Sequence, residues 1–243
     1  MPGMSAADYP RTASTTPTRL AERVSYDRAT AHAVLDEAVV AHVGYVVDGR
    51  PVVLPQLHAR VGDVLYLHGS TGARALRAAR DGGLPVCVTV TLLDGLVLAR
   101  SAFHHSINYR SVVVHGTAAV VDDPAEKAAA LEALVAAVVP GRPAGARGPD
   151  RKELAATTVL RLPLEEVSVK ARSGPPKDEP GDLDLPFWAG VLPLATVPGT
   201  PIPAPELTAG AEVPDHVRWW RRPVRAGGRT PDHVDGGHAA APR

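Results

Sequence analysis

The sequence predicts a mainly β domain of the α+β class, in which six or so antiparallel strands close into a small barrel with added helices. Short β-type runs alternate with tight turns, and this pattern joins neighbouring strands as an antiparallel meander. Hydrophobic residues make up 45% of the 243 residues, which is enough to bury a substantial core. Six or so strands with few helices between them exclude a doubly wound parallel sheet.

The first half of the predicted barrel is a meander of three strands. Val43–Val47 is apolar and β-branched, and Asp48-Gly49 after it is a strong hairpin signal. Pro51–Arg60 is the predicted return strand. A second turn follows at Gly62-Asp63, and the third strand is predicted over Val64–His68.

The second half of the chain supplies the remaining strands. These are Pro85–Leu92, Leu96–Arg100, Val112–Val121 and Thr157–Ala171. Asp94-Gly95 is a hairpin signal between the first two. Pro163 lies inside the last strand and indicates an edge position or a bulge, since proline has no N–H for a sheet ladder.

Helices are predicted where the apolar period changes to that of a helix. The first opens at Tyr26-Asp27-Arg28 with Asp27 or Ser25 as its N-cap, and the others run over about 73–80, 123–139 and 150–156. The third has Pro124 in its first turn. Its apolar side chains form one stripe, made of Ala128, Leu131, Leu134, Val135 and Val138.

Composition divides the chain into one domain with flanking segments. Residues 1–18 are predicted to be a disordered tail, 19–172 the barrel domain, 173–205 an extended arm that packs on it, and 206–243 mostly disordered. Phe187-Trp188 is expected to dock within the arm, and Trp219-Trp220-Arg221-Arg222 interrupts the last tail.

Charge and cysteine content limit the partners and the compartment. The formal net charge is +0, so no basic excess favours nucleic-acid binding. The one cysteine, Cys87, lies in an apolar run and is expected to be buried. No run is apolar enough to span a membrane, and the polar N-terminus has no secretory core. We therefore expect a cytoplasmic protein.

The sharpest local feature is the segment His68-Gly69-Ser70-Thr71-Gly72-Ala73-Arg74, between a predicted strand and a predicted helix. Unpaired N–H groups at a helix start, hydroxyls and an arginine fork can together hold one phosphate monoester. The spacing matches neither a Walker loop nor a dinucleotide fingerprint. A plain helix start on a surface turn explains the same residues.

A second feature is Asn108-Tyr109-Arg110-Ser111, at the head of a predicted buried strand. Polar side chains there face either a ligand or a partner. Arg110 can neutralise a phosphate or a reduced flavin ring, and strand-end capping with a surface ion pair is the alternative.

The ten histidines indicate no metal centre. No HExxH or paired Cys/His spacing is present, and His104 and His105 are adjacent, so on a strand they point to opposite sides. His32, His42 and His58 are expected to be surface or rim residues. His68 differs because it directly precedes the phosphate-type turn.

The order of these motifs resembles the pyridoxamine 5′-phosphate oxidase-like FMN-binding split barrels, and most closely their nitroimidazole-resistance-like branch. The segments that carry the resemblance lie between about Arg19 and Arg172, and they are Val53-Leu54-Pro55-Gln56, Leu65 to Arg74, and Asn108 to Gly116. The resemblance implies a six-stranded antiparallel split barrel that holds FMN at a homodimer interface.

It also implies roles for single residues. The backbone of Val53, Leu54, Pro55 and Gln56 would run beside the flavin ring. His68 would lie near the ring and relay a proton or contact substrate, which makes it the one candidate catalytic residue. The phosphate would be gripped by Ser70, Gly72 and Arg74, while Arg110 and Ser111 would reach the cofactor from the partner subunit. Gly69 and Tyr109 would also be cofactor-binding residues. Trp188 could cover the ring from the arm.

The resemblance leaves the reaction open. Ala73 replaces one of the basic pair that true pyridoxamine phosphate oxidases carry, and Ser168–Arg172 lacks their substrate-gripping segment. The first hypothesis is an FMN-dependent oxidoreductase, nitroreductase-like or oxidase-like, that passes electrons from a nicotinamide donor to a small organic acceptor. The alternatives are a split barrel that binds F420, or haem through His68 or His104, and a flavin-binding protein without catalysis.

Overall fold

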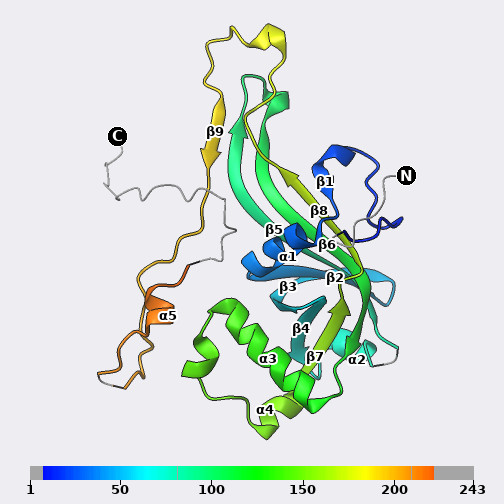
Figure 1. Cartoon of the computed structure of the whole chain (residues 1–243), viewed down its shortest axis with the longest axis vertical. Coiled ribbons are helices and arrows are strands. Elements are labelled where there is room, and N and C mark those ends of the chain that lie inside the picture. Colours follow the sequence, from blue (N-terminus) through cyan, green and yellow to red (C-terminus); the bar gives the residue numbers. More distant parts are fainter. Residues whose placement is uncertain (1–7, 81, 209, 222–243) are drawn as a thin grey trace.

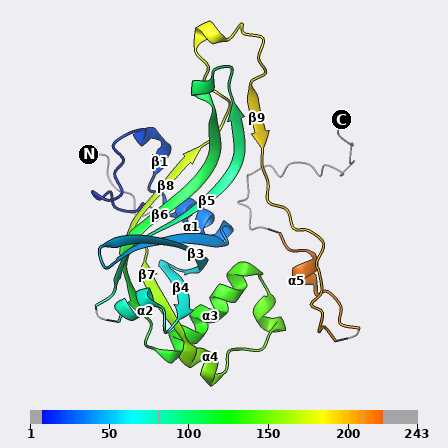
Figure 2. The ribbon, with the colours of Figure 1, turned by 180° about the vertical axis from the view of Figure 1, so that it is seen from behind.

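The computed structural model describes residues 8–80, 82–208 and 210–221. Six strands close into a ring in which every neighbouring pair is antiparallel (Figures 1 and 2). In ring order they are β2 (Val40–Val47), β3 (Arg50–Val61), β4 (Val64–Ser70), β7 (Thr157–Pro163), β6 (Ser106–Val120) and β5 (Leu84–Leu98). The predicted mainly β, six-stranded antiparallel split barrel is therefore confirmed.

Three short strands extend the sheet outside this ring. β8 (Glu166–Arg172) pairs with β6, β1 (Val24–Ser25) pairs with β8, and β9 (Gly190–Pro193) pairs with the free edge of β5. β9 is the part of the predicted 173–205 arm that docks by strand pairing. It lies along the β5–β6 ribbon, which projects well beyond the barrel (Figure 1).

The predicted β2–β3–β4 meander is present with its predicted turns. Asp48 and Gly49 form the first turn with φ of 51° and 73°, and Gly62 allows the second with φ of 58°. Glycine adopts such angles without a Cβ clash, and aspartate is among the residues that tolerate them best.

The hairpin predicted at Asp94-Gly95 is wrong. β5 continues through these residues to Leu98, with only a shift of register between Leu93 and Gly95. The chain reverses later, around the 3-10 helix η2 (Ala102–His104). Long-range contacts explain the difference, because Arg110 binds the Asp94 carboxylate and β9 packs so close to Gly95 that a Cβ there would lie 3.1 Å from the Leu192 carbonyl oxygen.

The single last strand predicted over Thr157–Ala171 is also wrong, because the chain there forms two strands, β7 and β8. Pro163 ends β7, as its missing N–H suggests. The Leu164 N–H then donates to the Asp63 carbonyl at 2.8 Å, and the chain crosses from β4 to β6. Leu164 and Val167 are both buried, so the crossing itself belongs to the core.

The predicted helices are all present. They are α1 (Arg28–Glu37), α2 (Arg74–Ala78), α3 (Pro124–Val138) and α4 (Arg151–Ala156), joined by a further short helix α5 (Asp215–Arg218). Side-chain caps start three of them, from Asp27, Asp123 and Asp150. The remaining 3-10 turns are η1 (Ala21–Arg23), η3 (Arg142–Gly145) and η4 (Pro180–Asp182).

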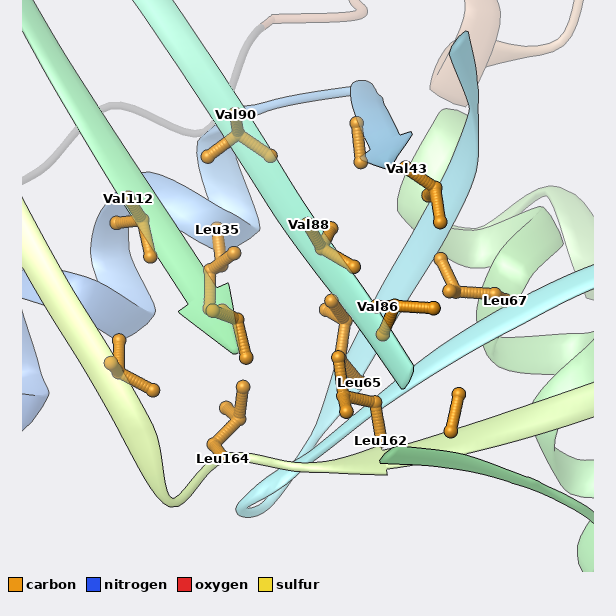
Figure 3. Close-up of a cluster of buried hydrophobic side chains, with 14 of the residues drawn as sticks. Leu35, Val43, Leu65, Leu67, Val86, Val88, Val90, Val112, Leu162 and Leu164 are labelled. Atoms are coloured by element: carbon orange, nitrogen blue, oxygen red, sulfur yellow. The ribbon is translucent and has the colours of Figure 1, made fainter. Parts of the chain in front are cut away.

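The barrel interior is packed with aliphatic side chains from alternate positions of its strands (Figure 3). β5 contributes Val86, Val88 and Val90, and α1 closes one end with Leu35. The filled interior leaves no room for a ligand, which places any binding site outside the barrel wall.

Residues 8–18 differ from the expected disordered tail. The Tyr9 side chain is only 1% exposed, and its N–H donates to the Tyr26 carbonyl at 2.8 Å. The Tyr26 hydroxyl in turn donates to the Thr15 carbonyl at 2.9 Å. The buried side chain of Tyr9 anchors this segment to the domain. The polar residues around Tyr9 led to the expectation of disorder.

The expected disordered C-terminal tail also contains described structure, since residues 215–218 form α5. The remaining tail residues, 222–243 with Arg222 of the Trp-Trp-Arg-Arg motif, lie outside the described residues, as do 1–7. Among the residues that are described, no helix is both long and apolar enough to cross a membrane.

Asp123→Ala is expected to lower the free energy of unfolding by about 1 kcal/mol, because it removes the α3 N-cap. The Asp123 carboxylate accepts from the N–H groups of Ala125 and Glu126 at 3.3 and 3.0 Å. Urea unfolding measures the change. The matched control is Asp122→Ala at the exposed neighbouring position, and equal losses for both variants would contradict the capping role.

His58 is buried in the core, which corrects its expected place at the surface or rim. Its Nε2 lies 2.9 Å from the Leu35 carbonyl oxygen, so Nε2 carries the proton, and no partner meets Nδ1. Burial lowers the pKa of His58 despite this hydrogen bond and the nearby Asp36 carboxylate. The folded protein therefore holds this imidazole neutral.

This burial predicts that acid destabilises the fold. The unfolded chain takes up a proton at His58 below about pH 6.5, and the folded chain resists it, so stability is complete above that pH and falls as the pH decreases. Burial lowers the pKa of His32 and His68 as well, and both add in the same direction. Urea midpoints measured between pH 8 and pH 5 test this. His58→Met should flatten the profile, and an unchanged profile in that variant would contradict the role of His58.

Candidate functional site

The barrel wall is split between β3 and β4. Residues 50–57 of β3 pair with β2 alone, and only residues 58–61 pair with β4. On the other side, residues 68–70 of β4 pair with β7 and with no part of β3. One edge of each segment therefore has no strand beside it among the described residues. The predicted flavin-side segments, Val53–Gln56 and His68–Ser70, lie on these two edges.

A cavity of about 750 Å³ lies against the split. Leu57 of β3 and His68 of β4 line one wall. The opposite wall is the predicted apolar stripe of α3, which contributes Ala128, Leu131, Leu134, Val135 and Val138. The stripe is only partly covered by protein, and Val135 is 41% exposed. A helix face of this kind needs an apolar cover, and a ligand in the cavity would supply it.

His68 points into this wall because alternate side chains of β4 face opposite sides. Leu65 and Leu67 face the barrel core, whereas His68 faces the α3 side. The Nδ1 atom of His68 is buried and has no hydrogen-bond partner. Burial lowers the pKa of His68, so the imidazole is neutral. A neutral imidazole with a free ring nitrogen can bind a metal or accept a proton.

The turn after His68 uses its polar groups within the chain. The Gly72 N–H donates to Ser70 Oγ at 3.3 Å, the Ala73 N–H to the Ser70 carbonyl at 2.9 Å, and the Thr71 N–H to the Ala156 carbonyl at 3.0 Å. Gly69 has a packing role as well, because a Cβ there would lie 2.7 Å from Leu76 Cδ1. Phosphate binding by this turn stays a prediction.

Arg74 is the most available cation of the turn. Its side chain is 72% exposed and pairs with Asp48 of the β2–β3 turn at 3.0 Å. Such an exposed pair contributes little stability, so a bound anion can replace Asp48. A second cavity of about 720 Å³ lies beside this region, but Thr71 is its only lining residue from the predicted phosphate turn.

Arg110 is held within its own chain. Its Nε and Nη2 donate to Asp94 at 2.9 and 2.8 Å, and its Nη1 and Nη2 donate to Glu37 at 2.5 and 2.9 Å. Hydrogen bonds to Asp94 and Glu37 raise the pKa of Arg110. Two carboxylates neutralise this guanidinium, so in this arrangement Arg110 is not the free cation that the sequence predicts beside a flavin.

Tyr109 and Ser111 lie on the outer face of β6, away from the split of their own chain. Tyr109 pairs across the strands with Leu93 and Arg172, and Ser111 Oγ donates to the Lys170 carbonyl at 3.1 Å. Any contact of these residues with a cofactor at the split would come from a second copy, which stays a prediction.

Comparison with known proteins places this fold in a family. A model of the pyridoxamine 5′-phosphate oxidase family matches residues 27–171. The chain belongs to this family. The resemblance found from the motifs is thereby confirmed. No curated protein matches the chain.

Two solved structures resemble this family member over most of its length. The flavocytochrome Anf3 from Azotobacter vinelandii is 38% identical with a TM-score of 0.80, and the match covers 86% of this chain and 97% of that one. The FAD and heme binding protein from Mycobacterium smegmatis is 43% identical with a TM-score of 0.77, covering 81% and 96%.

A more distant structure supports the fold alone. It is a candidate 5-nitroimidazole antibiotic resistance protein from Bacteroides thetaiotaomicron, 21% identical with a TM-score of 0.51, and the match covers 60% of this chain and 85% of that one. The predicted nitroimidazole-resistance-like branch is thus represented among the structural neighbours of this family member.

Sequence reasoning missed two parts of the site. The first is the pair Glu37 and Asp94, which binds Arg110. The sequence contained a signal for this pair, because Glu37 lies at the C-terminal end of a predicted helix. A negative charge there is unfavourable beside the helix dipole and needs a cation. The second is the cavity wall at 139–149, which reads as a Gly/Pro/Arg loop but contains η3.

Two further expectations concern residues outside the cavity. Cys87 is exposed on the outer face of β5, so its expected burial is wrong; Val86 and Val88 beside it take the inward positions. Trp188 packs against Gly190, the first residue of β9. The strand β9 lies along the β5–β6 ribbon, away from β3 and β4 (Figure 1). No group of three or more metal-ligating side chains occurs in the described part of this family member.

Proposed function

We propose that this chain is a flavin-binding oxidoreductase that also holds a haem. The observation that carries the proposal is the cavity at the split, with its uncovered apolar helix face and a neutral histidine whose Nδ1 has no partner. A haem is a large apolar ring that needs such a pocket and an axial ligand. The two similar structures over most of the chain are those of a flavocytochrome and of a FAD and heme binding protein.

His68 is the residue that would hold the haem iron. Its free nitrogen meets the requirement for a neutral imidazole donor. Arg142 lines the same cavity and offers a cation for the haem carboxylates, whereas Arg147 there is paired with Glu153 at 2.7 Å. His104, the other histidine considered from sequence, lies at the end of the β5–β6 ribbon and faces Glu179 at 3.6 Å. His68 is therefore the better placed of the two.

The flavin is proposed to bind along the open edge of β3. The backbone of residues 53–56 there has no strand beside it and can donate to or accept from a ring. Ser70, Gly72 and Arg74 are the proposed phosphate contacts. The sequence resemblance implies FMN, whereas the 43% identical relative is a FAD and heme binding protein, and this relative leads us to propose FAD. The mass of the flavin released from pure protein distinguishes the two.

A homodimer is proposed to complete the site. The outer sheet face, the open edge of β3 and the β5–β6 ribbon expose several large apolar side chains: Val40, Val46, Val53, Leu54, Leu93, Leu96, Ile107 and Leu192. A second copy would bury them, since monomers rarely expose large apolar patches. Tyr109 and Ser111 of this face would then contact the partner's cofactor. Light scattering at several protein concentrations measures the mass.

The flavin, when bound, would supply hydride and electron transfer. The chain's own contribution is to hold the ring and exclude water with the α3 stripe. If His68 Nδ1 binds the haem iron, the imidazole is neutral and this nitrogen cannot also carry a proton. His68 can therefore hold the haem or relay a proton through Nδ1, but not both. The proposed donor is a nicotinamide and the proposed acceptor a small organic molecule.

Turnover with NADH or NADPH and a panel of quinone, nitroaromatic and pyridoxal-type acceptors tests the enzymatic part. Absence of turnover with a bound flavin would favour the non-catalytic flavin-binding alternative. A bound F420 in place of a flavin would overturn the choice of cofactor. The single cysteine fits a reducing compartment, and we propose the cytoplasm.

A further inference from the structure

The C-terminal segment 214–220 lies beside the cavity wall. Both views place α5 next to the end of α3, at the end of a long extended stretch that follows β9 (Figures 1 and 2). The Trp220 indole N–H donates to the Val138 carbonyl at 3.1 Å. Val138 is the last residue of α3, and carbonyls at a helix end lack partners within the helix. Trp220 therefore caps the helix that forms the apolar wall.

His216 packs against η3 from the same side. A Cβ built on Gly141 would lie 3.4 Å from His216 Cβ, and one built on Gly145 would lie 3.4 Å from His216 Cε1. Gly141 also has φ of 86°, a conformation that favours glycine. The His216 side chain therefore lies in van der Waals range of the loop backbone at Gly141 and Gly145.

The residues that the segment contacts are neighbours of the cavity lining. Val138, Val139, Arg142, Pro143 and Ala146 line the cavity. Gly141 and Gly145, which His216 contacts, lie between them in sequence and are not part of the lining. His216 therefore contacts the α3–η3 wall at positions that do not line the cavity.

We infer that residues 214–220 form a strap that holds the α3–η3 wall against a ligand at the split and so sets how fast the ligand leaves. The ligand's identity rests on the proposed function, with haem as the occupant. The strap has few contacts of its own, since α5 has four residues and the stretch over 194–208 is exposed. Segments with few buried contacts open more readily than a barrel core.

The first test is haem release from full-length variants. Trp220→Phe keeps the ring and removes the N–H donor, and Trp219→Phe is the matched control because Trp219 is 63% exposed. Each protein is loaded with haemin, and transfer to excess apomyoglobin is followed. Loss of one hydrogen bond predicts about two- to tenfold faster release for Trp220→Phe. Trp219→Phe should match wild type, and equal release from all three would overturn the inference.

The second test needs no ligand. Amide hydrogen exchange of residues 139–147 in the ligand-free proteins should be faster in Trp220→Phe than in wild type or Trp219→Phe. Unchanged exchange would overturn the strap, and so would faster exchange without faster haem release. If wild type bound no haem, the proposed function would fail, and the exchange rates would then decide whether the strap exists.

Discussion

Replacing Arg110 with methionine is expected to lower the free energy of unfolding by about 3 kcal/mol, because the Glu37 carboxylate is then left buried without a cation. The Glu37 residue is 5% exposed, and Arg110 is its salt-bridge partner. The value stands at the low end for a broken buried pair because the side chains of Arg110 and Asp94 are each about a third exposed, which screens their charges. Urea unfolding at pH 7 measures the loss.

Two controls distinguish the loss of the Glu37–Arg110–Asp94 network from the loss of an ordinary surface ion pair. Arg74→Met breaks the exposed pair with Asp48 and should change stability by less than about 1 kcal/mol. The double variant Glu37→Gln with Arg110→Met should recover part of the loss, because the amide leaves no uncompensated charge. A loss in Arg110→Met no larger than in Arg74→Met would contradict a structural role for this network.

The His68→Ala variant is expected to lose haem binding while the protein stays folded. The imidazole is the one side-chain nitrogen of the described cavity lining that is buried without a partner, and an alanine cannot ligate iron. Haemin titration followed by the Soret band measures the loss. His68 faces away from the core side chains Leu65 and Leu67, so the substitution leaves the core intact. The free energy of unfolding should therefore change little.

The matched control is His104→Ala at the end of the β5–β6 ribbon. This variant should bind haem as wild type does, because His104 lies beside Glu179 and outside the cavity lining. Flavin content is measured in the same samples. Normal haem binding by His68→Ala, or its loss in His104→Ala, would contradict the proposal that His68 holds the haem.

The strand order of the barrel followed from local turn chemistry, but only where tertiary contacts agreed with it. Asp48-Gly49 and Asp94-Gly95 are the same dipeptide, and both predict a hairpin. The first forms one, with positive φ at both residues. The second lies inside β5, because Arg110 binds Asp94 and β9 packs on Gly95. The identity of two neighbouring residues carries no information about such contacts with distant parts of the chain.

The site was predictable in its parts and not in its assembly. The apolar stripe of α3 and the special place of His68 both follow from the sequence. Their meeting across one cavity does not, because it depends on β3 changing partners from β2 to β4 at residues 57 and 58. Arg110 shows the same limit, since Glu37 lies 73 residues away in the chain. Polar residues at a strand head predicted either a ligand or strand-end capping with an ion pair, and Arg110 forms ion pairs with Glu37 and Asp94.

The absorption spectrum of the purified, haemin-supplemented protein, with mass identification of what it binds, tests the central claim most directly. The account predicts a flavin band and a Soret band in wild type, and a flavin band alone in His68→Ala. A colourless protein that takes up neither added flavin nor haemin would contradict it.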